Sequence, residues 1–105
     1  MKYGLDDTAL NSLESIFHNY PGVEHVLIFG SRAKGNFKEG SDIDLAVKGA
    51  QLLFTDILEL KVRMDDLNLP YKIDLLHYNS ISDSEVRKHI DRVGKSIYPT
   101  IEEVV

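Results

Sequence analysis

The chain has no cysteine, and it has no apolar run long enough to cross a membrane. Without cysteine it cannot use disulfides, thiolate metal ligands or a cysteine nucleophile, so any bound metal must be held by oxygen or imidazole. A spanning helix needs about 20 consecutive apolar residues, and Met1 to Leu10 lacks the basic-then-apolar pattern of a secretory signal. We therefore expect a cytoplasmic protein with no membrane partner.

Basic residues are also scarce, since 12 Lys and Arg stand against 17 Asp and Glu, for a formal net charge of -5. Proteins that grip long nucleic acid normally carry a basic surface, so we expect no such partner. The 105 residues are 43% hydrophobic and 28% charged, as in ordinary globular domains. No repeat, low-complexity tract or linker is visible, and residues 1–105 are expected to form a single domain.

Hydrophobic periodicity predicts an alternation of helices and strands. Apolar residues three or four positions apart are typical of helices, whereas Val23 to Phe29 is apolar without alternation, as in a strand covered on both faces. The expected elements are a helix over 6–20, a strand over 23–29, a short helix after Gly30, a polar loop over 36–41, a strand over 42–47, a helix over 51–67 and a strand over 71–76.

The last part of the chain predicts another helix and an apolar tail. Ser82 and Glu85 form a capping box for a helix, on which Val86, Ile90, Val93 and Ile97 would line one face. The tail carries several apolar residues, which are Ile97, Tyr98, Ile101, Val104 and Val105. It would either cover the core or dock a partner. We hypothesise an interface, which would make the protein a homo-oligomer if it binds a second copy.

Two aspartates are spaced to share one face of a strand. Alternate strand residues project to the same side, so Asp42 and Asp44 lie together, while Ile43, Leu45 and Val47 take the opposite side. Adjacent carboxylates repel each other unless a cation sits between them. Because Mg²⁺ prefers carboxylate and phosphate oxygens, the pattern predicts a magnesium site, to which Asp74 on the later strand could add a third ligand.

A glycine-serine turn precedes this strand. Gly30 has no Cβ and would let a phosphate approach the backbone closely, and Ser31 is placed to cap the short helix and to donate a hydrogen bond. Arg32 and Lys34 could neutralise phosphate charge, although the sequence leaves open which side chain turns inward. With Ser41, these residues are our candidates for binding a nucleotide.

Together these residues predict nucleotidyl transfer. Two Mg²⁺ ions about 3.5 to 4 Å apart would activate an attacking hydroxyl and steady the departing pyrophosphate. Asp42 and Asp44 would share the ions, and Asp74 would ligate the ion on the acceptor side and could take its proton. The three aspartates are therefore the candidate catalytic and metal-binding residues.

Two other phosphate or cation motifs do not fit. A P-loop needs Lys followed by Ser or Thr after its second glycine, but Gly35 is followed by Asn36 and Phe37. An EF-hand needs a loop glycine and a closing glutamate, but the segment after Asp44 continues as Leu45-Ala46-Val47. We reject both motifs.

The segment GSRAKGNFKEGSDIDLAV, with YKIDLL downstream, resembles the signature of the DNA polymerase beta-like nucleotidyltransferase superfamily, and most closely that of its minimal nucleotidyltransferases. The superfamily motif of Gly-Ser, Asp-x-Asp and a later strand Asp is matched by Gly30, Ser31, Asp42, Asp44 and Asp74. The resemblance spans almost the whole chain. It implies an α/β (α+β) fold, a small mixed β-sheet with helices packed mainly on one side, Mg²⁺ as the cofactor and a nucleoside triphosphate, usually ATP, as the donor.

The resemblance also implies a partner. Minimal nucleotidyltransferases are often paired with a small helical HEPN protein, and some act as antitoxins by attaching AMP to a hydroxyl of that partner. We carry this over as a hypothesis for a toxin-antitoxin pair. The alternative is a noncatalytic nucleotide-binding module that neutralises or regulates its partner by contact alone.

Other polar and aromatic residues are interpreted as structural. The histidines, which are His18, His25, His77 and His89, share no spacing, and only His77, just after the strand over 71–76, invites a closer look. Glu59 and Arg63 are expected to pair on a solvated helix face. We expect Tyr71, Tyr78 and Tyr98 to lie at the edge of the core.

Overall fold

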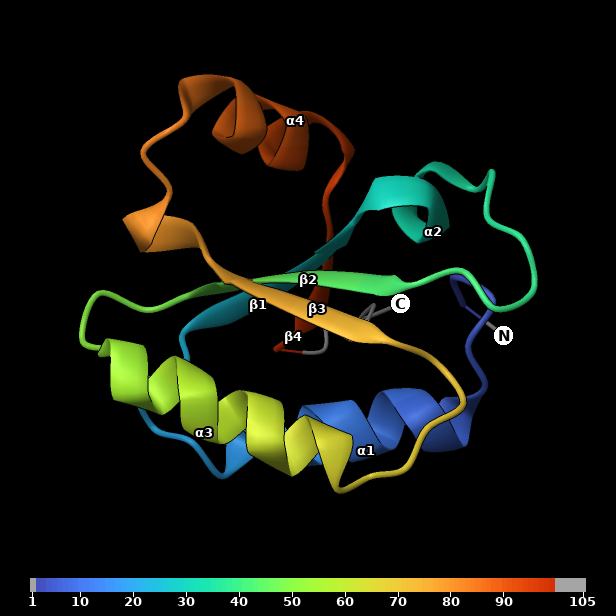
Figure 1. The fold of residues 1–105 in the computed structure, drawn as a ribbon, viewed down its shortest axis with the longest axis horizontal. Coiled ribbons are helices and arrows are strands. Elements are labelled where there is room, and N and C mark those ends of the chain that lie inside the picture. The colour runs from blue at the N-terminus through green and yellow to red at the C-terminus, as the bar shows by residue number, and fades with distance from the viewer. Residues whose placement is uncertain (1, 100–105) are drawn as a thin grey trace, which may run out of the picture.

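The computed structural model describes residues 2–99, which form a four-stranded sheet with helices on both faces (Figure 1). The elements in chain order are α1 (Asp7–His18), β1 (His25–Phe29), α2 (Gly30–Lys34), β2 (Ile43–Lys48), α3 (Phe54–Asp65), β3 (Ile73–His77), the 3-10 turn η1 (Tyr78–Ser80), α4 (Ser84–Val93) and β4 (Lys95–Tyr98). This mixed α/β architecture agrees with the fold expected from the sequence.

The sheet has the strand order β3-β2-β1-β4. Strand β1 pairs antiparallel with β2 and with β4, whereas β2 pairs parallel with β3. The end of β1 therefore lies beside the beginnings of β2 and β3. This arrangement brings three separate chain segments to one edge of the sheet.

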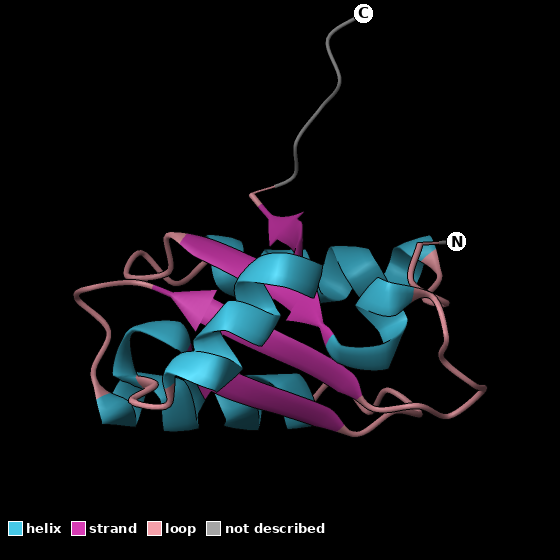
Figure 2. Cartoon of the chain, turned by 90° about the horizontal axis from the view of Figure 1, so that it is seen from above, coloured by secondary structure: helices cyan, strands magenta, loops and turns pink. Residues whose placement is uncertain are grey.

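The two longest helices, α1 and α3, cover one face and build the main core (Figures 1 and 2). Alternation along β2 sends Ile43, Leu45 and Val47 into this core, and all three are fully buried. Their helical counterparts are Leu13, Phe17, Leu60 and Met64. Burial of these apolar side chains supplies most of the driving force for folding.

The opposite face of the sheet carries a smaller core under α4. Leu27 of β1 and Ala46 of β2 pack there against Ile90, and all three side chains are buried. Since β1 contributes Val26 and Ile28 to the main core, its burial on both faces is confirmed. The short α2 lies over this same face, beside α4 (Figure 2).

The last helix differs from its sequence prediction at both ends. Its N-cap is Asp83, whose carboxylate accepts a hydrogen bond from the backbone N–H of Glu85 at 2.9 Å, so the predicted capping role of Ser82 is wrong. The helix ends at Val93. Ile97, which was predicted to lie on the helix, instead belongs to strand β4, which pairs with β1. A four-residue edge strand is too short for hydrophobic periodicity to distinguish from another helical turn.

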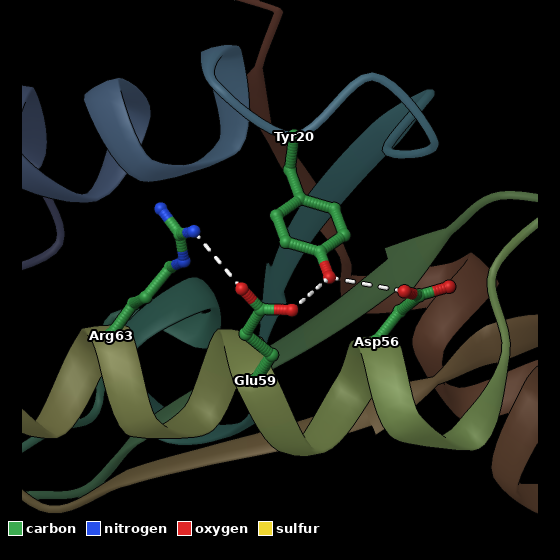
Figure 3. A network of polar contacts seen from close by, with 4 residues as sticks. All are labelled: Tyr20, Asp56, Glu59 and Arg63. Carbon is green, nitrogen blue, oxygen red and sulfur yellow. Dashed lines mark hydrogen bonds and ion pairs between the residues drawn. The ribbon is translucent and has the colours of Figure 1, made fainter.

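A polar network ties α3 to the loop after α1 (Figure 3). The hydroxyl oxygen of Tyr20 lies 3.0 Å from Asp56 and 2.8 Å from Glu59, so the two carboxylates share its single proton, and Arg63 pairs with Glu59 at 3.0 Å. The hydrogen bond to Glu59 raises the pKa of Tyr20, with further contributions from partial burial and from Asp56. The predicted pairing of Glu59 with Arg63 is confirmed, and it forms part of this anchor.

Of the predicted apolar tail, Ile97 and Tyr98 form part of β4, and Tyr98 packs against Phe17 with ring centroids 6.0 Å apart. Ile101, Val104 and Val105 lie outside the described residues. Within residues 2–99, none of the helices is both long and apolar enough to span a membrane.

Candidate active site

The strand register places Phe29, Asp44 and Asp74 in one row across the sheet. Asp44 pairs with Phe29 on its antiparallel side and with Asp74 on its parallel side. Directly paired residues project to the same face. The Asp44 and Asp74 side chains are therefore neighbours, immediately beside the turn at Gly30 that follows Phe29.

The Asp44 carboxylate has an electrostatic environment that disfavours its charge. Burial raises the pKa of Asp44, the negative charges of Asp74 and Asp42 raise it further, and Lys72 partly opposes this. Lys72 lies 3.8 Å from Asp74, measured from its Nζ to a carboxylate oxygen. The excess of like charge is what a bound cation would relieve.

Asp42 stands slightly apart from the other two acids. Strand β2 begins at Ile43, so Asp42 is the exposed residue immediately before the strand and not its first member. Across residues 2–99, no three acidic or histidine side chains are grouped so that they could hold a metal ion as they stand. The structure thus brings Asp44 and Asp74 together and leaves Asp42 at the margin of the pair.

Gly30 packs directly against Asp44. Its φ of +72° is in the left-handed region, and a Cβ placed on it would clash with the Asp44 carboxylate. Helix α2 begins at Gly30 with Phe29 as its N-cap and without a side-chain capping bond, so the predicted capping role of Ser31 is wrong. Ser31 instead lies within the first turn of α2, immediately after Gly30.

The other nucleotide-binding candidates lie in different settings. Lys34 is exposed at the end of α2, which Gly35 terminates in the left-handed conformation. The Ser41 hydroxyl accepts a hydrogen bond from the backbone N–H of Lys38 at 2.8 Å. Arg32 is buried, with 3% of its surface exposed, and its side chain is directed into the protein. We therefore leave Arg32 out of the set of phosphate contacts.

A cleft of about 520 Å³ adjoins the two paired acids at the open edge of β3. It is lined by Phe29, Asp44, Lys61, Asp65, Ile73, Asp74, Leu75 and Leu76. Sequence reasoning missed Phe29, Lys61 and Asp65 as parts of this site. Lys61 and Asp65 are four positions apart on α3, so the sequence predicts that they share one face of that helix. The spacing does not indicate which strand that face lies against.

His77 has a structural role. One ring nitrogen, Nε2, is 3.0 Å from the carbonyl oxygen of Gly49, and the other, Nδ1, is 2.8 Å from the hydroxyl of Ser80. These contacts join the loop after β2 to η1. Tyr78, in η1, packs on the smaller core and donates a hydrogen bond to Asp91 at 2.7 Å, as expected for a tyrosine at the core edge.

The candidate metal ligands suit Mg²⁺ and suit softer metals poorly. Asp42, Asp44 and Asp74 offer only carboxylate oxygens, the ligands that Mg²⁺ accepts alongside phosphate oxygens and water. Two of the three already repel each other across paired strands, and the missing Cβ of Gly30 makes room for the Asp44 carboxylate beside the turn. The residues present are therefore suited to Mg²⁺ with a phosphate ligand.

The chain is similar to known proteins in both sequence and fold. The chain is 43% identical over 63 residues to a Methanocaldococcus jannaschii protein, MJ0435, that is provisionally described as a protein adenylyltransferase. That match covers 57% of this chain and 64% of the relative, so it spans less than two thirds of the relative's length.

Two solved structures share the fold. A toxin-antitoxin structure with AMP-PNP superposes with a TM-score of 0.72 at 24% identity, covering 87% of this chain and 73% of the other. A tri-AMPylated HEPN toxin of Shewanella oneidensis in complex with its MNT antitoxin gives a TM-score of 0.68 at 21% identity, covering 91% and 74%. The sequence profile described as "Polymerase beta, Nucleotidyltransferase" matches residues 11–103. This chain belongs to the polymerase beta nucleotidyltransferase family.

Proposed function

We propose that this chain is a Mg²⁺-dependent nucleotidyltransferase that moves AMP from ATP to a hydroxyl group of a HEPN-type partner protein. The observation that carries the proposal is the row formed by Phe29, Asp44 and Asp74, which places the glycine turn at Gly30 beside two paired carboxylates. Such a row places a phosphate-binding turn and metal ligands within reach of one triphosphate.

The triphosphate would bind at the beginning of α2. Gly30 allows close approach to the backbone, and Ser31 in the first helical turn can donate a hydrogen bond from its hydroxyl. Lys34 is exposed and can reach the outer phosphates as a cation, and Ser41 lies beside Asp42 on the neighbouring loop. These residues would orient the donor so that its α-phosphorus faces the acidic pair.

The three aspartates would hold two Mg²⁺ ions. Asp42 and Asp44 would share them, and Asp74 would hold the ion that binds the acceptor. Bound Mg²⁺ would neutralise the triphosphate charge and lower the pKa of the attacking hydroxyl. Asp42 precedes strand β2, so its contribution depends on how the loop before that strand is held.

The transfer itself is a substitution at phosphorus. The acceptor oxygen forms a bond to the α-phosphorus of ATP, the bond from that phosphorus to the bridging oxygen of the β-phosphate breaks, and pyrophosphate leaves. The proton of the acceptor hydroxyl would pass to Asp74, which lies on the edge strand β3. The cleft along β3 gives that hydroxyl access to Asp74 from outside the sheet.

The partner is proposed from the relatives. A structural neighbour was solved as an antitoxin with an AMPylated HEPN toxin, and the M. jannaschii relative is described as acting on protein. A protein acceptor also suits an open cleft at a sheet edge, where a side chain of another polypeptide can enter. On this proposal, transfer of AMP by the chain would inactivate a toxic partner.

The test is to incubate the protein with ATP labelled at the α-phosphate, Mg²⁺ and the HEPN-type protein encoded beside it. Label should appear on the partner, with pyrophosphate released in equal amount. Asp42→Asn and Asp44→Asn should each lower the rate by about a hundredfold or more, as when one electrostatic group is removed from a transition state. Asp66→Asn, at an exposed helix end outside the cleft, is the matched control and should transfer normally.

Two results would overturn the proposal. Equal labelling by the wild type and by both aspartate variants would show that the acids do not carry the reaction. ATP binding and partner neutralisation without any pyrophosphate release would instead support the noncatalytic binding module.

A further inference from the structure

Arg32 is the one charged side chain that is buried among residues 2–99. Burial of a charge is costly unless hydrogen bonds and other favourable contacts replace its water. Arg32 therefore needs a compensating environment. The structure supplies one from three separate parts of the chain.

Three hydrogen bonds hold the guanidinium group. Its Nε and Nη2 atoms both donate to the carbonyl oxygen of Ser41, at 3.0 and 2.8 Å, and its Nη1 donates to the carbonyl oxygen of Tyr3 at 2.9 Å. The planar fork of arginine suits this double donation to a single oxygen, whereas the single ammonium of lysine could not reproduce it.

Two aromatic rings lie against the guanidinium group. The Cζ atom of Arg32 is 4.7 Å from the ring centroid of Tyr71 and 5.3 Å from that of Phe37. Both distances are within the range for cation–π attraction, which strengthens when the cation is removed from water. The rings therefore offset part of the cost of burying the charge.

The contacts of Arg32 converge on the segments that carry the acids. Ser41 immediately precedes Asp42, and Tyr71 leads into β3 three residues before Asp74. Arg32 itself lies in α2, two residues after Gly30. One side chain thus joins the proposed phosphate turn to both segments that lead to the metal ligands.

We propose that Arg32 is a positioning residue, which holds Asp42 at a fixed distance from the Gly30 turn and does not contact the nucleotide. The exposed fraction of 3% leaves no room for a phosphate at its side chain. Asp42 is the acid outside strand β2, so its backbone has no ladder hydrogen bonds to fix it. The Arg32 bonds to Ser41 perform that task from the preceding residue.

The catalytic part of this inference rests on the proposed function, and it is tested with Arg32→Lys in the full chain. We expect kcat to fall about tenfold to a hundredfold, because displacing a ligand through its supporting contacts typically costs that much. The KM for ATP should stay within about twofold, since no nucleotide contact is lost. The Mg²⁺ concentration for half-maximal rate should rise about tenfold. A result with unchanged kcat and a raised KM for ATP would overturn the proposal in favour of a direct phosphate contact.

A second measurement does not depend on activity. Hydrogen exchange at the backbone amides of residues 36–42 should be faster in Arg32→Lys than in the wild type, and unchanged in Arg63→Lys, an exposed arginine that also lies over a tyrosine ring. Equal exchange in all three proteins would refute the positioning role. If wild-type protein transfers no AMP, the proposed function fails, while this exchange result still decides the role of Arg32.

Tyr71→Leu covers the case in which Arg32→Lys does not fold. It removes one ring from the guanidinium group and leaves the bonds to Ser41 in place. We expect a smaller change of the same kind, with faster exchange over residues 36–42 and an unchanged KM for ATP. No increase in exchange in a folded Tyr71→Leu protein would count against the positioning role of Arg32.

Discussion

Replacing Asp44 by Asn removes the central charge of the acidic site while keeping the shape of the side chain. Asp44 and Asp74 occupy directly paired positions on parallel strands, and burial together with the charges of Asp74 and Asp42 raises the pKa of Asp44. The ionised carboxylate is therefore less stable in the folded protein than in water. In the absence of Mg²⁺, Asp44→Asn should be more stable than the wild type.

The size of this gain follows from the strand spacing. Neighbouring strands lie about 4.8 Å apart, so two paired carboxylates repel by about 1 kcal/mol in a water-like dielectric and by about 3 kcal/mol at an effective constant near 20. The Asp74 side chain is 44% exposed, and solvent screening at such positions favours the lower value. We expect a gain of about 1 kcal/mol, or a rise in Tm of about 4 to 8 °C for a domain of this size.

The gain should depend on pH with a defined sign. The folded-state pKa of Asp44 lies above its ordinary value of 3.8, so the folded protein holds this proton more tightly than the unfolded chain does. The penalty in the wild type is fully present above the raised pKa and disappears as pH falls toward the ordinary value. The advantage of Asp44→Asn should therefore be complete at pH 7 and lost near pH 3.

The assay is thermal unfolding followed by circular dichroism, with EDTA or with Mg²⁺ and an unreactive ATP analogue. Ligand should raise the Tm of the wild type and have little effect on Asp44→Asn, because binding to the folded state alone is what stabilises it. Glu14→Gln on α1, on the far side of the sheet, controls for the loss of one negative charge. The reasoning is refuted if Asp44→Asn is less stable than the wild type in EDTA, or if Mg²⁺ and the analogue stabilise both proteins equally.

Three further substitutions test separate features. Gly30→Ala should lower the free energy of unfolding by about 1 to 3 kcal/mol, because its Cβ would clash with Asp44 at a positive φ; urea denaturation measures this, and an unchanged midpoint would contradict it. Ile90→Ala should cost about 2 to 4 kcal/mol, since it empties the small core under α4; a loss below 1 kcal/mol would show that α4 contributes little. Tyr20→Phe should lower the urea midpoint slightly without affecting AMP transfer, because the lost hydroxyl contacts of Tyr20 anchor α3 outside the site. A change in the rate of AMP transfer would link this anchor to catalysis.

Much of the fold could be predicted from local patterns. The segments predicted as helices and strands up to residue 76 all appear, because apolar periodicity and breakers such as Pro70 act within a few residues. Strand β4 was missed, since its pairing with β1 depends on residues about 70 positions away. The N-cap at Asp83 in place of Ser82 reflects two good capping residues standing side by side.

The candidate site could likewise be predicted only where local properties of the chain decide it. Alternation along β2 was enough to place Asp44 opposite Ile43 and Leu45, and a glycine before Ser31 was enough to suggest a close backbone approach, because both properties belong to the local chain.

The placement of Arg32 was decided by the tertiary structure alone. Beside Gly30 and Ser31, an arginine in a nucleotide-binding turn suggests a phosphate contact. Its guanidinium instead takes carbonyl oxygens and aromatic rings from Tyr3, Ser41 and Tyr71, which no local pattern brings together. Sequence by itself thus identified the candidate site residues, and tertiary structure decided which of them lie beside the cleft and which one is buried, because burial of a charge depends on partners supplied by distant segments.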